Sequence, residues 1–527
     1  MPPDATGAGK GAFDVVLIGG GHNGLAAAIT LARKGRSVCV LERADRPGGM
    51  ARSSEPAAGA HVPEIAHLLY NLDARVAREL GLGLLLKSPP IPAVSLAPDG
   101  RHVVIAGDAA RFADGTPHPD APAFGELNAR LRRFAGLLGR LSLKSPPRFD
   151  GGLASLATMG EMAALARLGL DLKRLGKHEM REFLRILLGN AHDLVLDEMA
   201  DGPLAGAICA DAVRGNHVGP RSPGTVFNLM YRLGSGGAVR LPEGGMGAVC
   251  GAFEQAARAA GAEIRTGCDV VRILVENDAA KGVALRDGTT IRAGAVLSSA
   301  GPLQTMTLAG IGHFDVEAVR RARNLRCKGT VAKLNLVLGA APEITGLRGD
   351  LAAGRLLVAP SAVAVERAFN PVKYGELPAE PVIEAVIPTL TEPSLATNGR
   401  HILSANVQHI AHTPRGGWGD AARNRITATV LSQLERHMPG LKGLVEAAEL
   451  LTPADIEARF GAPGGHWHHA EMGIDQILTL RPANGLAHYR LAVHGLYLCG
   501  ASAHPGGDVT GLPGRNSARQ LLKDRIL

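Results

Sequence analysis

A glycine-rich turn between two short apolar segments constrains the fold of this chain more than any other feature of its sequence. Residues 14–18 (DVVLI) suit a parallel strand buried on both faces, and the turn that follows fits the spacing G-x-G-x-x-G. In such turns the first glycine permits the bend, the second lets a pyrophosphate approach the backbone, and the third lets the next helix pack on the strand. That helix, residues 25–34, presents its N-terminal N–H groups to the phosphates. The residues of the turn that we expect at the phosphates are Gly19, Gly21, His22, Asn23 and Gly24.

An acidic residue stands where such a unit needs one. A second apolar segment, residues 37–41, ends at Glu42, eighteen residues past Gly24. A carboxylate here can accept hydrogen bonds from both hydroxyls of an adenosine ribose, and it would repel a 2′-phosphate. The glycine spacing alone would be weak evidence in a chain with 68 glycines, and a glycine turn in some other α/β fold is the alternative. The order of strand, glycine turn, helix, strand and acid favours a unit that binds a dinucleotide.

A second glycine pair, Gly48 and Gly49, follows shortly after the ribose-binding acid. NAD-binding domains have no need of such a pair, whereas an extended flavin cofactor that passes close to the backbone requires small residues. Arg43 could add a cation near the phosphates, or it could be an ordinary surface arginine. The pair therefore favours FAD over NAD.

Length, charge and cysteine usage set broader limits. A chain of 527 residues exceeds one compact core, so two domains are expected. The net charge of +8 is dispersed, without the interleaved basic and aromatic residues that bind nucleic acid, although it could favour peripheral contact with an anionic membrane. No run of eighteen apolar residues is present, and the six cysteines are scattered without a C-x-x-C pair. We expect a cytoplasmic protein without disulfides, and its alanine, leucine and arginine bias is typical of a GC-rich bacterial genome.

Two later segments of the chain are also expected to lie at the cofactor. Residues 240–302 contain a helix and several strands, and residues 495–516 give a strand, a glycine-rich crossing and the start of a final helix. Small residues in these crossings suit close approach of the backbone to a large flat ligand. The residues expected at the cofactor are Val270 and Gly301 in the first segment and Gly500, Gly507, Asp508, Thr510 and Gly511 in the second.

Five motifs together resemble the phytoene desaturase-like FAD-dependent oxidoreductases, in particular the branch of pyridine nucleotide-disulphide oxidoreductase domain-containing protein 2. They are GGGHNGLAAA at 19–28, LERADRPGG at 41–49, LPEGGMGAV at 241–249, RPANGLAHYR at 481–490 and LYLCGASAHPGGDVTGLPGRNSAR at 496–519. Weaker similarity extends over nearly the full length. The resemblance implies non-covalent FAD. It also places Asp508 where relatives often carry glycine, so this carboxylate lies either near the flavin or in solvent.

The resemblance and the strand pattern predict an α/β fold. A Rossmann-type FAD-binding domain of the amine oxidase and phytoene desaturase kind would comprise residues 13–75, 240–305 and 490–527. An α+β substrate domain, built from insertions, would comprise residues 76–239 and 306–489. Polar and apolar residues alternate within 333–338 and 403–408, which predicts half-buried strands of a mainly antiparallel sheet with one face over the flavin.

Three residues are candidates for proton transfer. In a desaturation a hydride goes to flavin N5 and a proton leaves the neighbouring carbon, so a base is useful. His67 follows the glycine pair at the distance where related flavoproteins pass the isoalloxazine ring. The family usually has a histidine and an acid at the positions of His469 and Glu471. A structural role is the alternative for all three. The histidines at 466, 468 and 469 lack any accompanying metal-ligand spacing, so no metal is expected.

We expect an FAD-dependent oxidoreductase that desaturates or otherwise dehydrogenates a hydrophobic small molecule. A flavin-dependent isomerase or reductase of an unsaturated lipid or isoprenoid is one alternative, and a flavin-stabilised binding or assembly protein is another. No second glycine fingerprint follows a strand, which favours oxygen or a quinone over NAD(P) as electron acceptor. The identity of the substrate and the oligomeric state stay open at this point.

Overall fold

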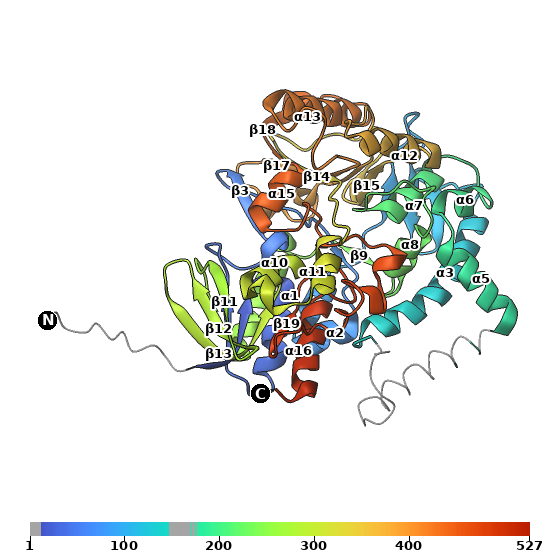
Figure 1. Cartoon of the computed structure of the whole chain (residues 1–527). Helices are drawn as coiled ribbons and strands as arrows, with labels where there is room; N and C mark the ends of the chain where they lie inside the picture. Colours follow the sequence, from blue (N-terminus) through green and yellow to red (C-terminus); the bar gives the residue numbers. More distant parts are fainter. Residues whose placement is uncertain (1–11, 147–169, 171–172, 174–175, 527) are drawn as a thin grey trace.

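The computed structural model describes residues 12–146, 170, 173 and 176–526 and contains two large sheets (Figure 1). The first has the strand order β10-β2-β1-β13-β12-β11, with β19 beside β13. Its pairs β10–β2, β2–β1, β1–β13 and β13–β19 are parallel, and the hairpin β11–β12 joins β13 in antiparallel fashion. Their bounds are β1 Phe13–Ile18, β2 Val38–Leu41, β10 Glu263–Arg265, β11 Val270–Glu276, β12 Ala279–Leu285, β13 Thr290–Ser298 and β19 Leu496–Leu498.

Helix α1 (His22–Ala32) connects β1 to β2 and packs between α9 (Gly245–Ala259) and α16 (Leu512–Asp524). Its alanine-rich sequence allows this close packing, because nearly every residue from Asn23 to Leu31 is buried. A Cβ atom at Gly514 would lie 1.8 Å from the carbonyl oxygen of Asn23, so only glycine lets α16 approach α1 so closely. The glycine turn is thereby held between the parallel strands and two further helices.

The second sheet has eight strands in the order β18-β14-β17-β16-β15-β6-β7-β8. All neighbouring strands in it are antiparallel except β15 and β6. Their bounds are β6 Ala93–Ser95, β7 Val103–Ala106, β8 Ala109–Phe112, β14 Val331–Leu338, β15 Arg355–Val358, β16 Ile383–Val386, β17 His401–Gln408 and β18 Val445–Leu451. Every strand of the first sheet comes from residues 13–75, 240–305 or 490–527, and every strand of the second from 76–239 or 306–489.

The alternating strands of the second sheet are buried more completely than expected. Every residue of β14 is buried, including Lys333 and Asn335, and so are all residues of β17 after His401. The alternation is real, but the polar side chains point toward other buried polar groups instead of water: Asn335 donates to the carbonyl of Pro63 at 3.0 Å. The expectation of half-buried strands was therefore wrong.

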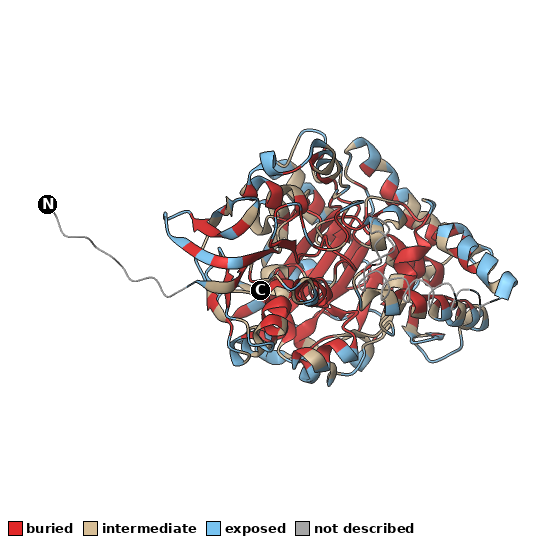
Figure 2. Ribbon diagram, turned by 60° about the horizontal axis from the view of Figure 1, so that its bottom comes forward, coloured by how far each residue is buried: buried red, intermediate tan, exposed pale blue. Residues whose placement is uncertain are grey.

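The remaining helices cover both sheets, and buried strands lie at the centre of the molecule in Figure 2. Helices α3, α5, α7 and α8 gather on one side of the second sheet, and α13 covers it at the far end in Figure 1. Two short ribbons, β3 (Ser53–Ala57) with β4 (Ala60–Pro63) and β5 (Leu69–Tyr70) with β9 (Val239–Arg240), complete the strands of the described residues. The other helices are α2 Ala74–Leu80, α3 Ala121–Ser142, α5 Gly176–Leu188, α6 Ala191–Leu196, α7 Pro203–Val213, α8 Val226–Leu233, α10 Pro302–Ala309, α11 Val316–Arg323, α12 Ala362–Phe369, α13 Asp420–Glu435, α14 Leu441–Leu444 and α15 Pro453–Phe460.

Candidate functional site

A cavity of about 580 Å³ lies at the carboxyl ends of β1 and β2, beside the N-terminus of α1. Residues from the C-terminal half of the chain close it, among them Asn406 of β17 and residues of the segment from Phe460 to His469. Its volume is typical of small-molecule and cofactor sites, which span about 300–1,000 Å³. A position beyond the carboxyl ends of parallel strands is where open α/β sheets bind ligands.

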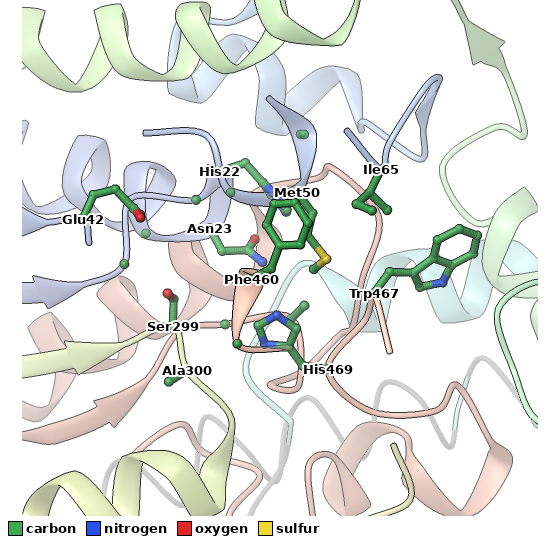
Figure 3. Close-up of a pocket in the computed structure, with 18 of the residues that line it drawn as sticks. His22, Asn23, Glu42, Met50, Ile65, Ser299, Ala300, Phe460, Trp467 and His469 are labelled. Atoms are coloured by element: carbon green, nitrogen blue, oxygen red, sulfur yellow. The ribbon is translucent and has the colours of Figure 1, made fainter. Parts of the chain in front are cut away.

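The cavity brings together most of the residues predicted at the cofactor. In Figure 3 Glu42 lies at one end and Trp467 at the other, with His22, Asn23 and His469 between them. The predicted cofactor residues that line the cavity are Gly19, Gly21, His22, Asn23, Gly24, Glu42, Arg43, Gly49, Val270, Gly500 and Asp508.

Five other predicted residues lie behind the wall and shape the backbone there. Gly48 donates its N–H to the carbonyl of Gly20 at 2.9 Å, and Gly511 is the N-cap of α16. The Thr510 hydroxyl accepts a hydrogen bond from the N–H of Leu512 at 3.2 Å. The five residues are Gly48, Gly301, Gly507, Thr510 and Gly511, and a direct contact between any of them and the cofactor stays a prediction.

The glycine turn fits a cofactor that carries a pyrophosphate. Gly21 caps the N-terminus of α1 without any side-chain hydrogen bond, which leaves the first N–H groups of the helix available to an anion. A Cβ atom at Gly21 would meet only the Cα of Gly49, at 3.9 Å, so the backbone is open toward the cavity. Buried atoms beside the turn, His22 Nε2 and Asn23 Oδ1, find no hydrogen-bond partner among the described residues. These features are those expected of a site that binds FAD.

Glu42 is held in place by the backbone on either side of it. Its Oε2 accepts the N–H of Gly20 at 2.7 Å, and its Oε1 accepts the N–H of Ala44 at 2.9 Å. Each carboxylate oxygen keeps acceptor capacity for a ribose hydroxyl. Arg43 is exposed and donates to the carbonyl of Arg459 at 2.7 Å, so it joins the two walls of the cavity near this end.

Replacing Glu42 by alanine should weaken FAD binding at least tenfold. The variant loses one or two charge-assisted hydrogen bonds to the ribose, each worth about 1.5–3 kcal/mol. It also leaves the N–H of Gly20 without its side-chain acceptor. Equilibrium dialysis of the apoprotein against FAD measures the dissociation constant. Glu55→Ala, at an exposed position on β3, is the matched control. An unchanged constant for Glu42→Ala would show that the carboxylate does not contact the ribose.

Of the three predicted catalytic residues, only His469 lines the cavity. His67 is buried behind the wall, where its Nε2 lies 2.9 Å from Oε1 of Glu384. Glu471 is also buried, and its side chain turns to Arg326, at 3.4 Å, and to the N–H of Lys328, at 3.3 Å. This geometry favours the structural alternative for His67 and Glu471, because both side chains have buried partners.

A chain of buried charges runs from the cavity wall into the protein, and sequence reasoning missed most of it. Asp508 Oδ1 lies 3.3 Å from Nη1 of Arg214, and Nε of Arg214 lies 3.7 Å from Glu384. Glu384 pairs with Arg355, Arg355 with Asp211, and Asp211 with Arg232. Three carboxylates alternate with three guanidinium groups, so their formal charges cancel. No local motif marks Arg214, the member that links the cavity to the interior.

Asp508 itself is buried at the cavity wall and does not face solvent. Its side chain is 4% exposed, and its Oδ2 accepts a hydrogen bond from Asn71 at 2.6 Å. Burial opposes ionisation of this carboxyl, but His468, Arg214 and Asn71 outweigh burial and hold its pKa well below the usual range. The cavity wall therefore carries an ionised carboxylate that lies beside Arg214 and His468.

A second cavity of about 400 Å³ lies between α3, α7 and α8, and most of its wall is apolar. Asp211, Arg232 and Arg355 close its inner end. The ring of Tyr70, which lines the first cavity, lies 5.1 Å from the guanidinium of Arg232 and 5.8 Å from that of Arg355. A residue that lines the first cavity therefore contacts two residues that line the second.

In the described part of the chain, no group of three or more histidine, cysteine, aspartate or glutamate side chains could hold a metal ion. Within the same residues, no helix has both the length and the apolar character that crossing a membrane requires.

Comparison with known proteins identifies the family. Residues 24–338 match the family model of flavin-containing amine oxidoreductases. The chain is 30% identical to mouse pyridine nucleotide-disulfide oxidoreductase domain-containing protein 2, over 99% of this chain and 95% of that protein. It is 25% identical to a neurosporene-forming phytoene desaturase of Cereibacter sphaeroides, over 96% of this chain and 93% of that protein. The crystal structure of an oxidoreductase from Methanosarcina mazei shares the fold, with a TM-score of 0.60 at 19% identity, covering 97% of this chain and 99% of that one.

These matches confirm the resemblance to the phytoene desaturase-like branch, the α/β fold class and the FAD cofactor. The family model begins at Gly24, inside the glycine turn that borders the cavity. The chain belongs to the family of flavin-containing amine oxidoreductases and is an FAD-dependent oxidoreductase.

Proposed function

We propose that this enzyme dehydrogenates a hydrophobic small molecule, with N5 of FAD as the hydride acceptor. The observation that carries the proposal is the composition of the cavity at the end away from Glu42. Ile65 and Trp467 line it there, and Met50 and Phe460 line its middle (Figure 3). Tyr70 of this cavity also contacts Arg232, which lines the largely apolar second cavity. Such walls favour an apolar substrate, because burial of apolar area contributes about 25 cal/mol per Å².

FAD supplies the redox step, and the chain supplies binding, orientation and proton transfer. Within this proposal His469 is the proton acceptor. Enclosure in the cavity, together with the neighbouring His22 and His468, lowers the pKa of His469 to about 4, so its imidazole is neutral at neutral pH. The residue lines the cavity, where a neutral imidazole can accept a proton from a substrate carbon beside the flavin.

Anaerobic mixing with candidate substrates tests the proposal. A dehydrogenase should bleach its flavin stoichiometrically when mixed with an uncharged isoprenoid that it oxidises. His469→Gln should slow the bleaching at least a hundredfold while flavin content stays unchanged, because general base catalysis contributes about 10²–10⁴-fold. His494→Gln, at an exposed position, is the matched control.

Two outcomes would contradict the proposal. Conversion of the substrate without net bleaching would indicate an isomerase instead. A panel of isoprenoids that causes neither bleaching nor any change in the flavin spectrum would favour a binding or assembly protein.

We further propose oxygen or a quinone as the electron acceptor. Support comes from the sequence, in which only one glycine fingerprint follows an apolar strand, because many enzymes that use NADPH bind it on a second nucleotide-binding unit. Stopped-flow mixing of the oxidised enzyme with NADH or NADPH should leave the flavin absorbance unchanged over the turnover time. Oxygen and a soluble quinone should reoxidise the reduced enzyme. Rapid bleaching by either nicotinamide at micromolar concentration would overturn this assignment.

A further inference from the structure

Helix α5 exposes a row of apolar side chains on the outside of the molecule. Three of the ten large apolar side chains that are exposed in the described part of the chain belong to this one helix: Met180, Leu184 and Leu188 are 36%, 47% and 58% exposed. Their spacing of four residues places them in one stripe along the helix. In Figure 1 α5 lies at the edge of the molecule, beyond α3.

The same side of the helix carries positive charge. At about 100° of rotation per residue, Lys177 and Arg181 lie within or next to the arc of the apolar stripe, and both are exposed. The two acidic residues of the helix, Glu179 and Glu182, fall on the opposite half. Glu179 pairs with Arg133 of α3 at 3.4 Å, and Glu182 is paired within the helix at 2.8 Å. We refer to one set of residues as the outer face of α5: Lys177, Met180, Arg181, Leu184 and Leu188.

The opposite side of α5 is packed against the rest of the molecule. Phe183 and Ile186 are buried, and the ring centroid of Phe183 lies 5.2 Å from that of Phe134 on α3. Helix α5 also contacts α8. Both neighbours, α3 and α8, contribute to the wall of the second cavity. The helix therefore has two apolar sides, of which one belongs to the core and the other, mixed with cations, is exposed.

This mixture of apolar and cationic side chains fits the surface of an anionic bilayer. Lysine and arginine are attracted to acidic headgroups, while apolar side chains beside them reach the acyl boundary. A second copy of this chain fits less well, because a symmetric contact would bring two positively charged faces together. A nucleic acid offers phosphates to Lys177 and Arg181 but nothing to the apolar stripe between them.

We propose that the outer face of α5 docks the enzyme on the surface of a membrane that contains anionic phospholipids. The helix lies along the membrane surface, with its cations at the headgroups and its apolar stripe between them. The proposal goes beyond the proposed oxidation and does not depend on it. It places α3 and α8, which wall the second cavity, behind the docking helix and close to a phase in which hydrophobic molecules concentrate.

Vesicle flotation with the FAD-loaded, full-length enzyme tests the proposal. One set of vesicles contains phosphatidylcholine alone, and the other contains phosphatidylcholine and phosphatidylserine. Binding to the vesicles with phosphatidylserine should be at least about tenfold stronger, because two cations lie on the docking face. High salt should remove most of this difference, since it screens exposed charges. Glycerol phosphate, a free headgroup without acyl chains, should not compete with the vesicles.

Leu184→Glu is the decisive variant, because it places a negative charge in the middle of the apolar stripe. Its binding to vesicles with phosphatidylserine should fall at least about tenfold. Flavin content and thermal midpoint should stay unchanged, since the side chain is exposed. Val316→Glu makes the same change on α11, at a residue that is 85% exposed, and is the matched control. The control should bind vesicles as the wild-type enzyme does.

The double variant Lys177→Gln with Arg181→Gln tests the charges separately. Each cation near an anionic surface contributes about fivefold in affinity, so the double variant should bind vesicles with phosphatidylserine about 25-fold more weakly. Lys34→Gln with Lys281→Gln removes two exposed cations elsewhere and lowers the net charge equally. This control should keep the wild-type affinity, because its two lysines lie outside the docking face.

Binding that does not depend on phosphatidylserine, or no binding to either set of vesicles, would overturn the proposal. Binding to anionic vesicles that survives both α5 variants would show that another surface docks. Sedimentation velocity without lipid examines the other occupant: a dimer that Leu184→Glu dissociates would show that a second copy covers this face. None of these measurements involves turnover, so the proposed oxidation is tested separately.

Discussion

Replacing Gly21 by alanine should leave the apoprotein folded and remove most of its FAD. The added methyl group meets only the Cα of Gly49, at 3.9 Å, so the protein itself has room for it. The methyl group would occupy space that the pyrophosphate needs, and such overpacking costs about 1–3 kcal/mol, or roughly 5- to 150-fold in the dissociation constant. Equilibrium dialysis against FAD measures this change, and circular dichroism of the apoprotein reports the fold.

Gly24→Ala provides the contrast. Its Cβ atom would lie 2.1 Å from the carbonyl oxygen of Gly19, so α1 must move away from the turn. We expect this variant to lose stability and FAD affinity together, whereas Gly21→Ala loses affinity with only about 1 kcal/mol of stability, the difference between glycine and alanine as N-cap residues. Normal FAD binding by Gly21→Ala would mean that the cofactor does not pass over this residue.

The nucleotide-binding part of the site was predictable because its signals are local. A buried strand, a glycine spacing and an acid within residues 14–42 specify one structural unit. Each glycine is required there because a side chain at its position would clash with the backbone or with the cofactor. The contact between Gly24 and the Gly19 carbonyl is such a case. Eleven of the predicted cofactor residues line one cavity for this reason.

The substrate end could not be predicted in the same way, because it depends on contacts between residues that are far apart in sequence. Asp508 and Arg214 are separated by 294 positions, and His67 and Glu384 by 317. His67 was a candidate because it follows a cofactor motif, with a structural role as the alternative, and the fold gives it a buried carboxylate partner. The sequence left Asp508 either beside the flavin or in solvent, and only the packing of β5, α7 and the C-terminal crossing places it on the cavity wall.

The polar strands show the same limit. Alternation in β14 and β17 correctly indicates two different faces, but period-two patterns alone do not distinguish a face in water from a face against other polar groups. Lys333 donates to Asn406 at 3.2 Å, and Asn406 in turn lies 3.0 Å from His67. Such a network needs three segments of chain, which no single stretch of sequence reveals.

Mild acid should unfold this protein, and buried histidines are the reason. His67, His409, His437 and His504 are each at most 4% exposed. Burial is the main cause that lowers the pKa of His67, His437 and His504 to about 4 and that of His409 to about 3. In the unfolded chain each of these imidazoles titrates near 6.5. The unfolded state therefore binds more protons between pH 6.5 and 4, and stability is complete above pH 6.5 and falls as the pH drops through this window.

The expected effect is large. Each such histidine contributes up to about 1.4 kcal/mol per pH unit, so four contribute up to about 5.6 kcal/mol per unit, against a typical total stability of about 5–15 kcal/mol. Carboxyl groups whose pKa is lowered in the folded protein do not add to this loss of stability. Asp508 is one of them, and its contribution to the free energy of unfolding disappears only as the pH falls below about 4. Urea titrations at pH 7.5, 6.5 and 5.5, with saturating FAD, measure the free energy of unfolding.

His409→Asn separates this mechanism from a general effect of acid. Both ring nitrogens of His409 lack hydrogen-bond partners among the described residues, and its φ of 64° is one that asparagine tolerates. The variant should be less stable at pH 7.5 because the side chain is smaller, yet its stability should fall less steeply with acid, by up to about 1.4 kcal/mol per pH unit. His494→Asn, at an exposed position, should keep the wild-type slope. A wild-type stability that is the same at pH 5.5 and 7.5 would show that the folded protein accepts protons at these histidines, and that the buried network around His67 rearranges to accommodate the charge.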